Sequence, residues 1–413
     1  MSGKISKISG SIVTVTGLSC TKMADMVTIG PNQLIGEVVG LTTAGAWVQV
    51  YESTHGLKTG DAVTCTCKPL EIELGPGLLG AFLDGLGRPW PALYAASGGT
   101  VAAGIRVPSL DRAKRCTFNP SVTVGAKVSA GDVIGTVQET RTALHKISVP
   151  AHISGTVAEV HSGERTVEET VVIVKGFDGT DHKLSMAQRR PLRIPAPIAQ
   201  RHLSETLLKT GAAEFDGAHP LTRGGTALLS ASGGAKSTLL DLIQGADADV
   251  IVYVNCGGRG AEIASFQKTL SEQTDAKGEA LDPRIVHIAS PADSPAAACE
   301  ISIYTGLTIA SYFRDMGQHV LLIADSLDAW IGALSATGGL IGSAAYEGGP
   351  PTDISTRLGQ FFAHAGTVTC LGGDNRQGSL TLIGIAAPDM PGFWTNTMTR
   401  LPQVVWEQEE DHD

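Results

Sequence analysis

The sequence predicts an α/β protein in which two β-rich modules precede a mostly parallel sheet flanked by helices. Strand-like alternation of apolar and polar residues fills the first 70 positions and returns between about 105 and 190. From about residue 195, short apolar runs alternate with stretches of helical periodicity, the pattern of a parallel sheet with crossover helices. A chain of 413 residues is long enough for two or three such units.

The first module, residues 1–70, is predicted to be a small β-barrel. Short alternating runs at 5–15, 35–39 and 46–51 are separated by turn residues, as in a compact all-β unit. Residues 71–104 are rich in Gly and Pro turns and are predicted to link the barrel to the start of the core.

The second module, residues 105–193, is predicted to be a compact sandwich built from hairpins such as 124–137 and 153–160. Its lysines raise the question of a lipoyl or biotinyl attachment site. Neither Lys127 nor Lys146 lies in a Met-Lys or Asp-Lys hairpin tip, so we interpret both as surface lysines.

The third module, residues 194–400, carries the α/β pattern. A helix is predicted over 301–316, where apolar residues recur at helical spacing. Residues 401–413 are predicted to be an acidic tail, frayed from Glu407 to Asp413. The predicted strands are 226–229, 250–254, 285–288, 320–324, 368–371 and 380–385.

Composition excludes several classes of protein. The net charge of −10 argues against nucleic acid or an anionic membrane as the main partner. No apolar run reaches the length of a membrane span, and the first residues lack a signal-peptide core. The seven cysteines are scattered, and Cys65 and Cys67 lack the second pair of a zinc site. We therefore expect a cytoplasmic protein with reduced thiols and no direct membrane insertion.

A phosphate-binding loop is predicted between the strand at 226–229 and a helix that includes 238–243. The expected pattern is Gly-x-x-x-x-Gly-Lys-Ser/Thr, in which the lysine reaches the β- and γ-phosphates and the hydroxyl reaches Mg²⁺. Lys236 and Ser237 fit this pattern, but Ser230 and Ala235 replace both glycines, and Ala235 fits only if its φ is negative. The alternative is a Gly/Ser turn with a surface lysine. The candidate nucleotide-binding residues are Ser230, Ala231, Ser232, Gly233, Gly234, Ala235, Lys236, Ser237 and Thr238.

Two further positions could complete a nucleotide site. Asp325 ends the apolar run 320–324, where an aspartate beside a phosphate loop holds Mg²⁺ through water, together with Ser237. A helix cap is the alternative role for Asp325. In the tight turn at 255–262, Arg259 is a candidate phosphate contact, but no acidic residue occupies 255–261 to orient an attacking water.

Over nearly its whole length the sequence resembles the catalytic A (alpha) subunit of V/A-type rotary ATPases. The resemblance is strongest from Ser302 to Gly317 and at Ile323-Ala-Asp-Ser326. It implies a barrel, a bulge insertion and a RecA-like nucleotide-binding domain, with Mg-ATP or ADP as ligand. Other matching runs are 73–79, 84–85, 88–89, 145–150, 166–169 and 190–193.

The resemblance also implies partners and a location. Family A subunits alternate with B subunits in a hexameric ring, joined to central-stalk and membrane-sector subunits. This machine couples ATP synthesis or hydrolysis to proton or sodium transport. The implied location is cytoplasmic and peripheral to a membrane ATPase complex.

Departures from the family pattern fall on the active site. Besides the two lost loop glycines, Gly258 stands where the family has the water-orienting glutamate. Cys299 stands where the family has the phosphate-contacting arginine of its Ala-Ala-Arg-Glu run. Asp328-Ala329-Trp330 replaces Ser-Arg-Trp. We also expect the family's trailing helical domain, which completes the adenine pocket, to be missing.

Four interpretations follow from these departures. The chain could be a ring subunit with impaired catalysis, or a working ATPase whose missing groups come from a neighbouring subunit. It could instead be a non-catalytic paralogue that acts in assembly or regulation through its barrel and bulge, or the product of a decaying gene. Loss of the glutamate alone predicts a loss of several orders of magnitude in hydrolysis.

Overall fold

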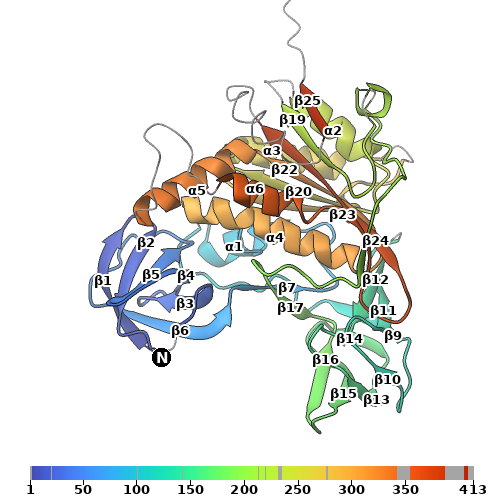
Figure 1. Ribbon diagram of the computed structural model, residues 1–413, viewed down its shortest axis with the longest axis horizontal. Helices are drawn as coiled ribbons and strands as arrows, with labels where there is room; N and C mark the ends of the chain where they lie inside the picture. Colours follow the sequence, from blue (N-terminus) through green and yellow to red (C-terminus); the bar gives the residue numbers. More distant parts are fainter. Residues whose placement is uncertain are drawn as a thin grey trace, which may run out of the picture.

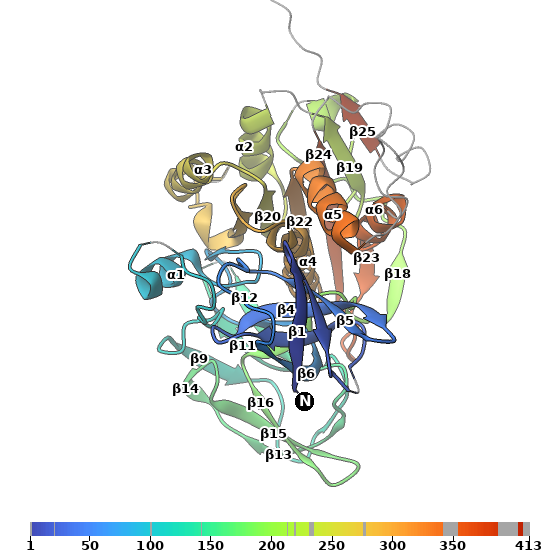
Figure 2. The same cartoon turned by 90° about the vertical axis from the view of Figure 1, so that its left-hand side faces the viewer.

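The structure is a computed structural model with three modules, and in both views the barrel and the bulge lie below the nucleotide-binding domain (Figures 1 and 2). It describes residues 2–386, except 20, 100, 142, 213, 219, 231–234, 276–277 and 342–353, together with 404–407.

The N-terminal barrel is confirmed as a closed barrel with strand order β1-β2-β5-β4-β3-β6. Apolar side chains on alternate positions point inward, and Val13, Val15, Val48 and Val63 are fully buried, as expected for strands with one face in a core. Its strands are β1 (Ser2–Ser9), β2 (Ile12–Thr16), β3 (Asp25–Ile29), β4 (Leu34–Thr42), β5 (Gly45–Val50) and β6 (Ala62–Pro69).

The bulge consists of two four-stranded antiparallel sheets packed around one apolar core that includes Phe118. One sheet has the order β10 (Lys127–Val128), β13 (Gly155–Val160), β15 (Thr170–Gly176), β16 (Asp181–Ser185). The other has the order β12 (Leu144–Ser148), β11 (Val133–Gln138), β9 (Arg115–Pro120), β14 (Gly163–Thr166).

The chain enters and leaves the bulge next to a two-stranded sheet, and both ends contact Glu73 in that sheet. Strand β7 (Glu71–Leu74) pairs antiparallel with β17 (Gln188–Pro191), and Arg189 lies opposite Glu73. On the entry side, Arg112 donates to both carboxylate oxygens of Glu73 at 2.7 Å. Glu73 therefore holds the chain where it enters the bulge and where it leaves.

The nucleotide-binding domain is built on a mixed sheet with the order β18-β23-β24-β22-β20-β21-β8, and β19 pairs with β24 and β25. Strands β19, β24, β22, β20, β21 and β8 run parallel, and β23 is antiparallel to β24. The strands are β8 (Phe82–Leu83), β18 (Gln200–His202), β19 (Thr226–Ser230), β20 (Val250–Cys256), β21 (Ile285–Ser290), β22 (His319–Asp325), β23 (Gly366–Thr369), β24 (Gln377–Ala386) and β25 (Val404–Glu407). Strand β25 lies in the predicted acidic tail, and fraying was predicted from Glu407 onward, so that prediction was wrong for Glu407, the last residue of the strand.

Helices cover both faces of this sheet (Figure 1). Alternate residues of β20 point to opposite faces of the sheet. Val252 and Val254 belong to the core under α4–α6, whereas Ile251 belongs to the core under α2 and α3. The helices are α1 (Trp90–Ser97), α2 (Ala235–Gly245), α3 (Gly260–Glu272), α4 (Ala296–Arg314), α5 (Leu327–Ile341) and α6 (Ile354–Phe362), with a π-helix at Glu214–Ala218 and a 3-10 helix at Asp282–Arg284.

His287 is a buried base whose charge state links stability to pH. Its side chain on β21 packs against the rings of Phe82, Tyr253 and Phe266, and burial lowers its pKa from 6.5 to about 3. In the unfolded chain the ordinary pKa of about 6.5 applies. Unfolding therefore takes up a proton, and stability is lost as the pH falls from about 6.5 towards 3.

We predict that this one side chain lowers the free energy of unfolding by about 2 kcal/mol between neutral pH and pH 5. Urea unfolding at a series of pH values measures the effect. His287→Phe keeps an aromatic ring in the core but removes the titrating group, so it should flatten the pH dependence, whereas the same change at the exposed His55 should not. An unchanged slope in His287→Phe would contradict the prediction.

Candidate functional site

The predicted phosphate loop lies between β19 and α2, as the sequence indicates. Ser230 ends β19 in register with Ala386 of β24, and α2 begins at Ala235. Ala235 therefore has a helical backbone, which meets the requirement for a negative φ. Ala231, Ser232, Gly233 and Gly234 lie outside the described residues, as do the side chains of Ser230, Ala235, Lys236, Ser237 and Thr238.

Asp325 lies at the same edge of the sheet as this loop. Parallel strands end together, so the loops after β19, β20, β21 and β22 gather at one edge, the usual ligand edge of such sheets. Asp325 ends β22 beside Asn255 of β20. Tyr253 donates its hydroxyl to Asp325 Oδ2 at 2.8 Å, and Asn255 Nδ2 makes a longer contact of 3.4 Å to the same oxygen. Burial and the charge of Asp325 raise the pKa of Tyr253 well above 10, so the hydroxyl remains a donor.

Asn255 also occupies the space next to Gly258. A Cβ atom added at Gly258 would lie 2.3 Å from Asn255 Oδ1 and 3.2 Å from Ile263 Cγ1. The first separation is far shorter than any normal contact, so a larger residue at 258 requires Asn255 to rotate away. As Asn255 lies in this structure, its amide leaves no room for a side chain at position 258. Sequence reasoning missed Asn255, although a polar residue at the end of an apolar strand was a visible signal.

Cys299 lies in the first turns of α4, 6% exposed. Its Sγ lies 3.9 Å from the carbonyl oxygens of Ser290 and Pro291, and Cys256 donates its thiol to the Cys299 carbonyl at 3.4 Å. A side-chain hydrogen bond with Cys299, together with burial, raises the pKa of the Cys256 thiol. Cys299 therefore lies beside the buried thiol of Cys256, and it supplies no positive charge for a phosphate.

The remaining candidates lie around the loop after β20. Ala329 faces this loop, because a Cβ added at Gly257 would lie 2.7 Å from the Cβ of Ala329. Arg259 is exposed at the start of α3. It lines a cleft of about 670 Å³ together with Arg88, Trp90 and residues 289–295. Within residues 255–261, all of which the structure describes, the turn carries no carboxylate.

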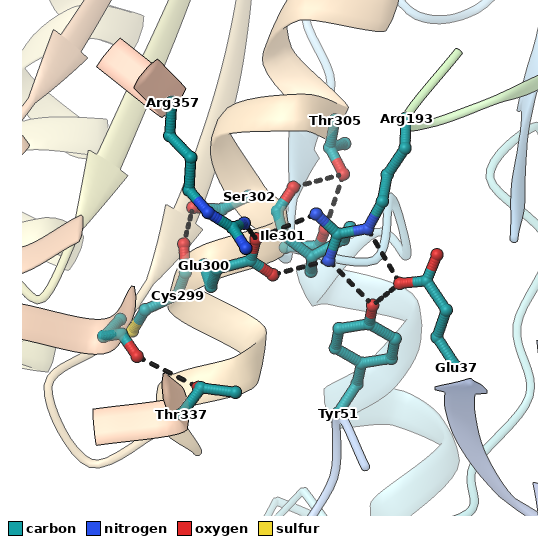
Figure 3. A network of polar contacts seen from close by, with 12 residues as sticks. Glu37, Tyr51, Arg193, Cys299, Glu300, Ile301, Ser302, Thr305, Thr337 and Arg357 are labelled. Carbon is teal, nitrogen blue, oxygen red and sulfur yellow. Dashed lines mark hydrogen bonds and ion pairs between the residues drawn. The ribbon is translucent and has the colours of Figure 1, made fainter. Parts of the chain in front are cut away.

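A buried ion network fixes the start of α4 to the barrel (Figure 3). Arg193 donates to both oxygens of Glu300, at 2.8 and 2.7 Å, and to Glu37 at 2.8 Å. Tyr51 donates its hydroxyl to Glu37, and Arg357 of α6 lies 3.8 Å from Glu300. Since Glu300 follows Cys299, the network positions the helix end that reaches the site.

Three family profiles match the three modules. The ATP synthase alpha/beta family beta-barrel domain matches residues 5–66, the ATP synthase alpha/beta subunit barrel-sandwich domain matches 107–193, and the ATP synthase alpha/beta family nucleotide-binding domain matches 211–398. The V-type ATP synthase alpha chain of Clostridioides difficile is 41% identical over 98% of this chain and 69% of its own length. The A subunit of the A-type ATP synthase of Methanopyrus kandleri is 40% identical over 98% of this chain and 69% of its own length.

The chain belongs to the A (alpha) subunit family of V/A-type ATP synthases. The V-type ATP synthase alpha chain of Acetivibrio thermocellus is similar to the same degree, at 42% identity over 98% of this chain and 70% of its own length. This membership confirms the resemblance drawn from the motifs and the predicted arrangement of a barrel, a barrel-sandwich bulge and a nucleotide-binding domain. Within the part of the chain that the structure describes, no helix is long and apolar enough to cross a membrane.

Proposed function

We propose that this chain is an A-subunit-like component of a V/A-type rotary ATPase that binds nucleotide but hydrolyses it slowly or not at all. The observation that supports impaired catalysis is the position of Asn255, whose Oδ1 takes the space that a side chain at Gly258 needs. Rapid hydrolysis requires a group that orients the attacking water. Residues 255–261 include no carboxylate that could orient a water.

The lost positive charges add to this effect. Cations that stabilise the charge on the transferred phosphoryl group are each worth about 10³-fold or more in rate. Cys299, with its thiol against backbone carbonyls, and Ala329 both stand where such a cation would act. An arginine from a neighbouring B subunit would supply one positive charge but would not replace the water-orienting carboxylate.

Nucleotide binding depends on groups that the chain keeps. Lys236 would contact the β- and γ-phosphates, backbone N–H groups at the start of α2 would face the phosphates, and Ser237 and Asp325 would hold Mg²⁺. The donor set suits Mg²⁺, which prefers hard oxygen ligands and retains several waters. Bound Mg²⁺ would neutralise phosphate charge. Tyr253 orients Asp325 through the 2.8 Å hydrogen bond.

The proposed partners are those of the family. The chain would alternate with B subunits in a ring, contact central-stalk and membrane-sector subunits, and lie in the cytoplasm against the membrane complex. A non-catalytic role in assembly or regulation, through the barrel and the bulge, is the proposal that would replace this one if nucleotide is not bound.

Calorimetric titration with Mg-ATP, and with Mg-GTP for comparison, tests the proposal, and Lys236→Ala is the decisive variant. We predict saturable binding to the wild type in the micromolar range and a loss of about 100-fold or more in Lys236→Ala, because the lysine supplies the cation at the phosphates. Lys268→Ala, an exposed lysine of α3 with its side chain 75% exposed, serves as the matched control. Unchanged affinity in Lys236→Ala would remove the loop from the proposal, and no heat up to millimolar nucleotide would support the non-catalytic assembly role.

A further inference from the structure

A second cavity lies far along the chain from the phosphate loop, where the bulge meets the nucleotide-binding domain. We call it the junction cavity, and its volume is about 230 Å³. Its walls are residues 148–152 of the bulge, the connector between 188 and 197, and one face of α4 at Leu307, Thr308 and Ser311. None of these residues belongs to the candidate nucleotide site.

The interior of the junction cavity is apolar. Val149, Leu192 and Leu307 line it and are each less than 5% exposed. Ile194, also in the lining, leaves 59% of its surface exposed. An apolar cavity of about 150 Å³ accepts benzene, so this larger cavity has room for a fused pair of rings or a short alkyl chain.

One wall of the cavity carries an excess of positive charge. Asp315 is bound on one oxygen by Arg190 at 2.6 Å and on the other by Arg314 at 2.7 Å. Arg376 donates to the backbone carbonyl of Asp315 at 2.8 Å. Two guanidinium groups thus share a single carboxylate. Arg376 lies beside them and pairs with Asp374 at 2.6 Å, so with the exposed Arg189 four arginines face two carboxylates here.

Two further observations agree with a positive potential at this wall. Arg189 is exposed in the lining, and no carboxylate pairs with it among the described residues. His364 also lines the cavity, and its pKa is lowered first by burial and further by the charges of Arg314 and Arg201. An apolar interior with a cationic wall complements a ligand that has an apolar body and one acidic group.

We propose that the junction cavity binds a small amphipathic carboxylate. The apolar body lies against Val149, Leu192 and Leu307, and the carboxylate faces Arg189, Arg190 and Arg376. Because the walls come from the bulge, the connector and α4, a bound molecule contacts all three at once. It thereby stabilises one placement of the bulge against the helix that begins beside Cys299.

Three probes with the same ring system separate charge from shape. Naphthalene-2-carboxylate, its neutral amide and 2-naphthylmethylammonium share a naphthalene body, and calorimetry or saturation-transfer NMR on the full chain measures their binding. For a ligand of this size we expect a dissociation constant on the order of 100 µM for the carboxylate. The amide should bind about tenfold more weakly, and the ammonium more weakly still. Equal affinity for all three probes, or no binding of the carboxylate at millimolar concentration, would overturn the proposal.

Substitutions at the cavity locate the binding. Arg189→Glu should weaken the carboxylate about tenfold and leave the amide unchanged, whereas Lys183→Glu, at an exposed residue of the bulge, makes the same charge change away from the cavity and should alter neither. Ile194→Asp, which places a negative charge in the exposed part of the lining, should also weaken the carboxylate. Ala196→Trp should fill the cavity and abolish binding of the carboxylate and the amide, provided its thermal unfolding matches the wild type. Affinities unchanged in Arg189→Glu and Ile194→Asp would show binding elsewhere on the chain and would overturn the assignment.

Discussion

Replacing Arg193 with methionine should lower the free energy of unfolding by about 3–5 kcal/mol, the range for breaking a buried ion pair from one side. Glu37 and Glu300 are each 2% exposed, and Arg193 contacts both of them. Methionine keeps much of the aliphatic bulk but leaves two buried carboxylates close together without their shared cation. Urea unfolding at pH 7 measures the loss.

A control and a second substitution make this prediction specific. Arg115→Met removes an arginine whose side chain is 56% exposed and 4.0 Å from Glu164, and exposed pairs contribute less than about 1 kcal/mol. Adding Glu300→Gln to Arg193→Met removes one of the uncompensated charges, so the double variant should lose less than the sum of the two single losses. Additive losses, or a loss below about 1 kcal/mol in Arg193→Met, would show that the network does not hold the barrel to α4.

Restoring a glutamate at position 258 should fail unless Asn255 is changed with it. In Gly258→Glu, the new Cβ forces Asn255 to rotate away from Tyr253 and Asp325, which should cost about 1–3 kcal/mol of stability. ATP turnover should stay at the wild-type level, since the misplaced carboxylate cannot orient water. In Asn255→Gly/Gly258→Glu the space is free, and turnover should rise by roughly 10–100-fold while remaining slow, because the positive charges are still missing.

Steady-state phosphate release and urea unfolding on the two single variants and the double variant form a complete cycle. Asn255→Gly alone is the control for the loss of its hydrogen bonds. If Gly258→Glu alone is as stable as the wild type, Asn255 does not block this position. If it hydrolyses ATP appreciably, the losses at Cys299 and Ala329 matter less than we infer.

The modules were predictable because their signals are local. Alternation with a period of two places Val13, Val15 and Val48 on one face of the barrel wall regardless of what lies beyond. The apolar runs that became β20 and β22 carry another local signal, because strands buried on both faces have continuous apolar sequences. Strand direction carries no such signal, which is why the run at 368–371 gave no indication that β23 is antiparallel.

The site was predictable only in part, for a related reason. Lys236, Ser237 and Asp325 could be named as candidates because the roles proposed for them follow from positions at strand and helix ends. Asn255 blocks Gly258 through a side-chain rotamer, and Arg193 meets Glu300 across 107 positions of the chain. Neither periodicity nor motif spacing in the sequence predicts a contact that depends on a side-chain rotamer or one that joins residues far apart in the chain.

The meeting of both bulge ends at Glu73 has an evolutionary consequence. A module whose entry and exit are clamped side by side can grow, shrink or be exchanged while the two flanking modules keep their places, because only a short gap has to be closed. The sequence of the bulge can therefore change to fit new neighbouring proteins while the nucleotide-binding domain stays the same. Chimaeras that swap bulges between relatives, joined at Arg112 and Arg189, are accordingly the grafts with the best prospect of folding.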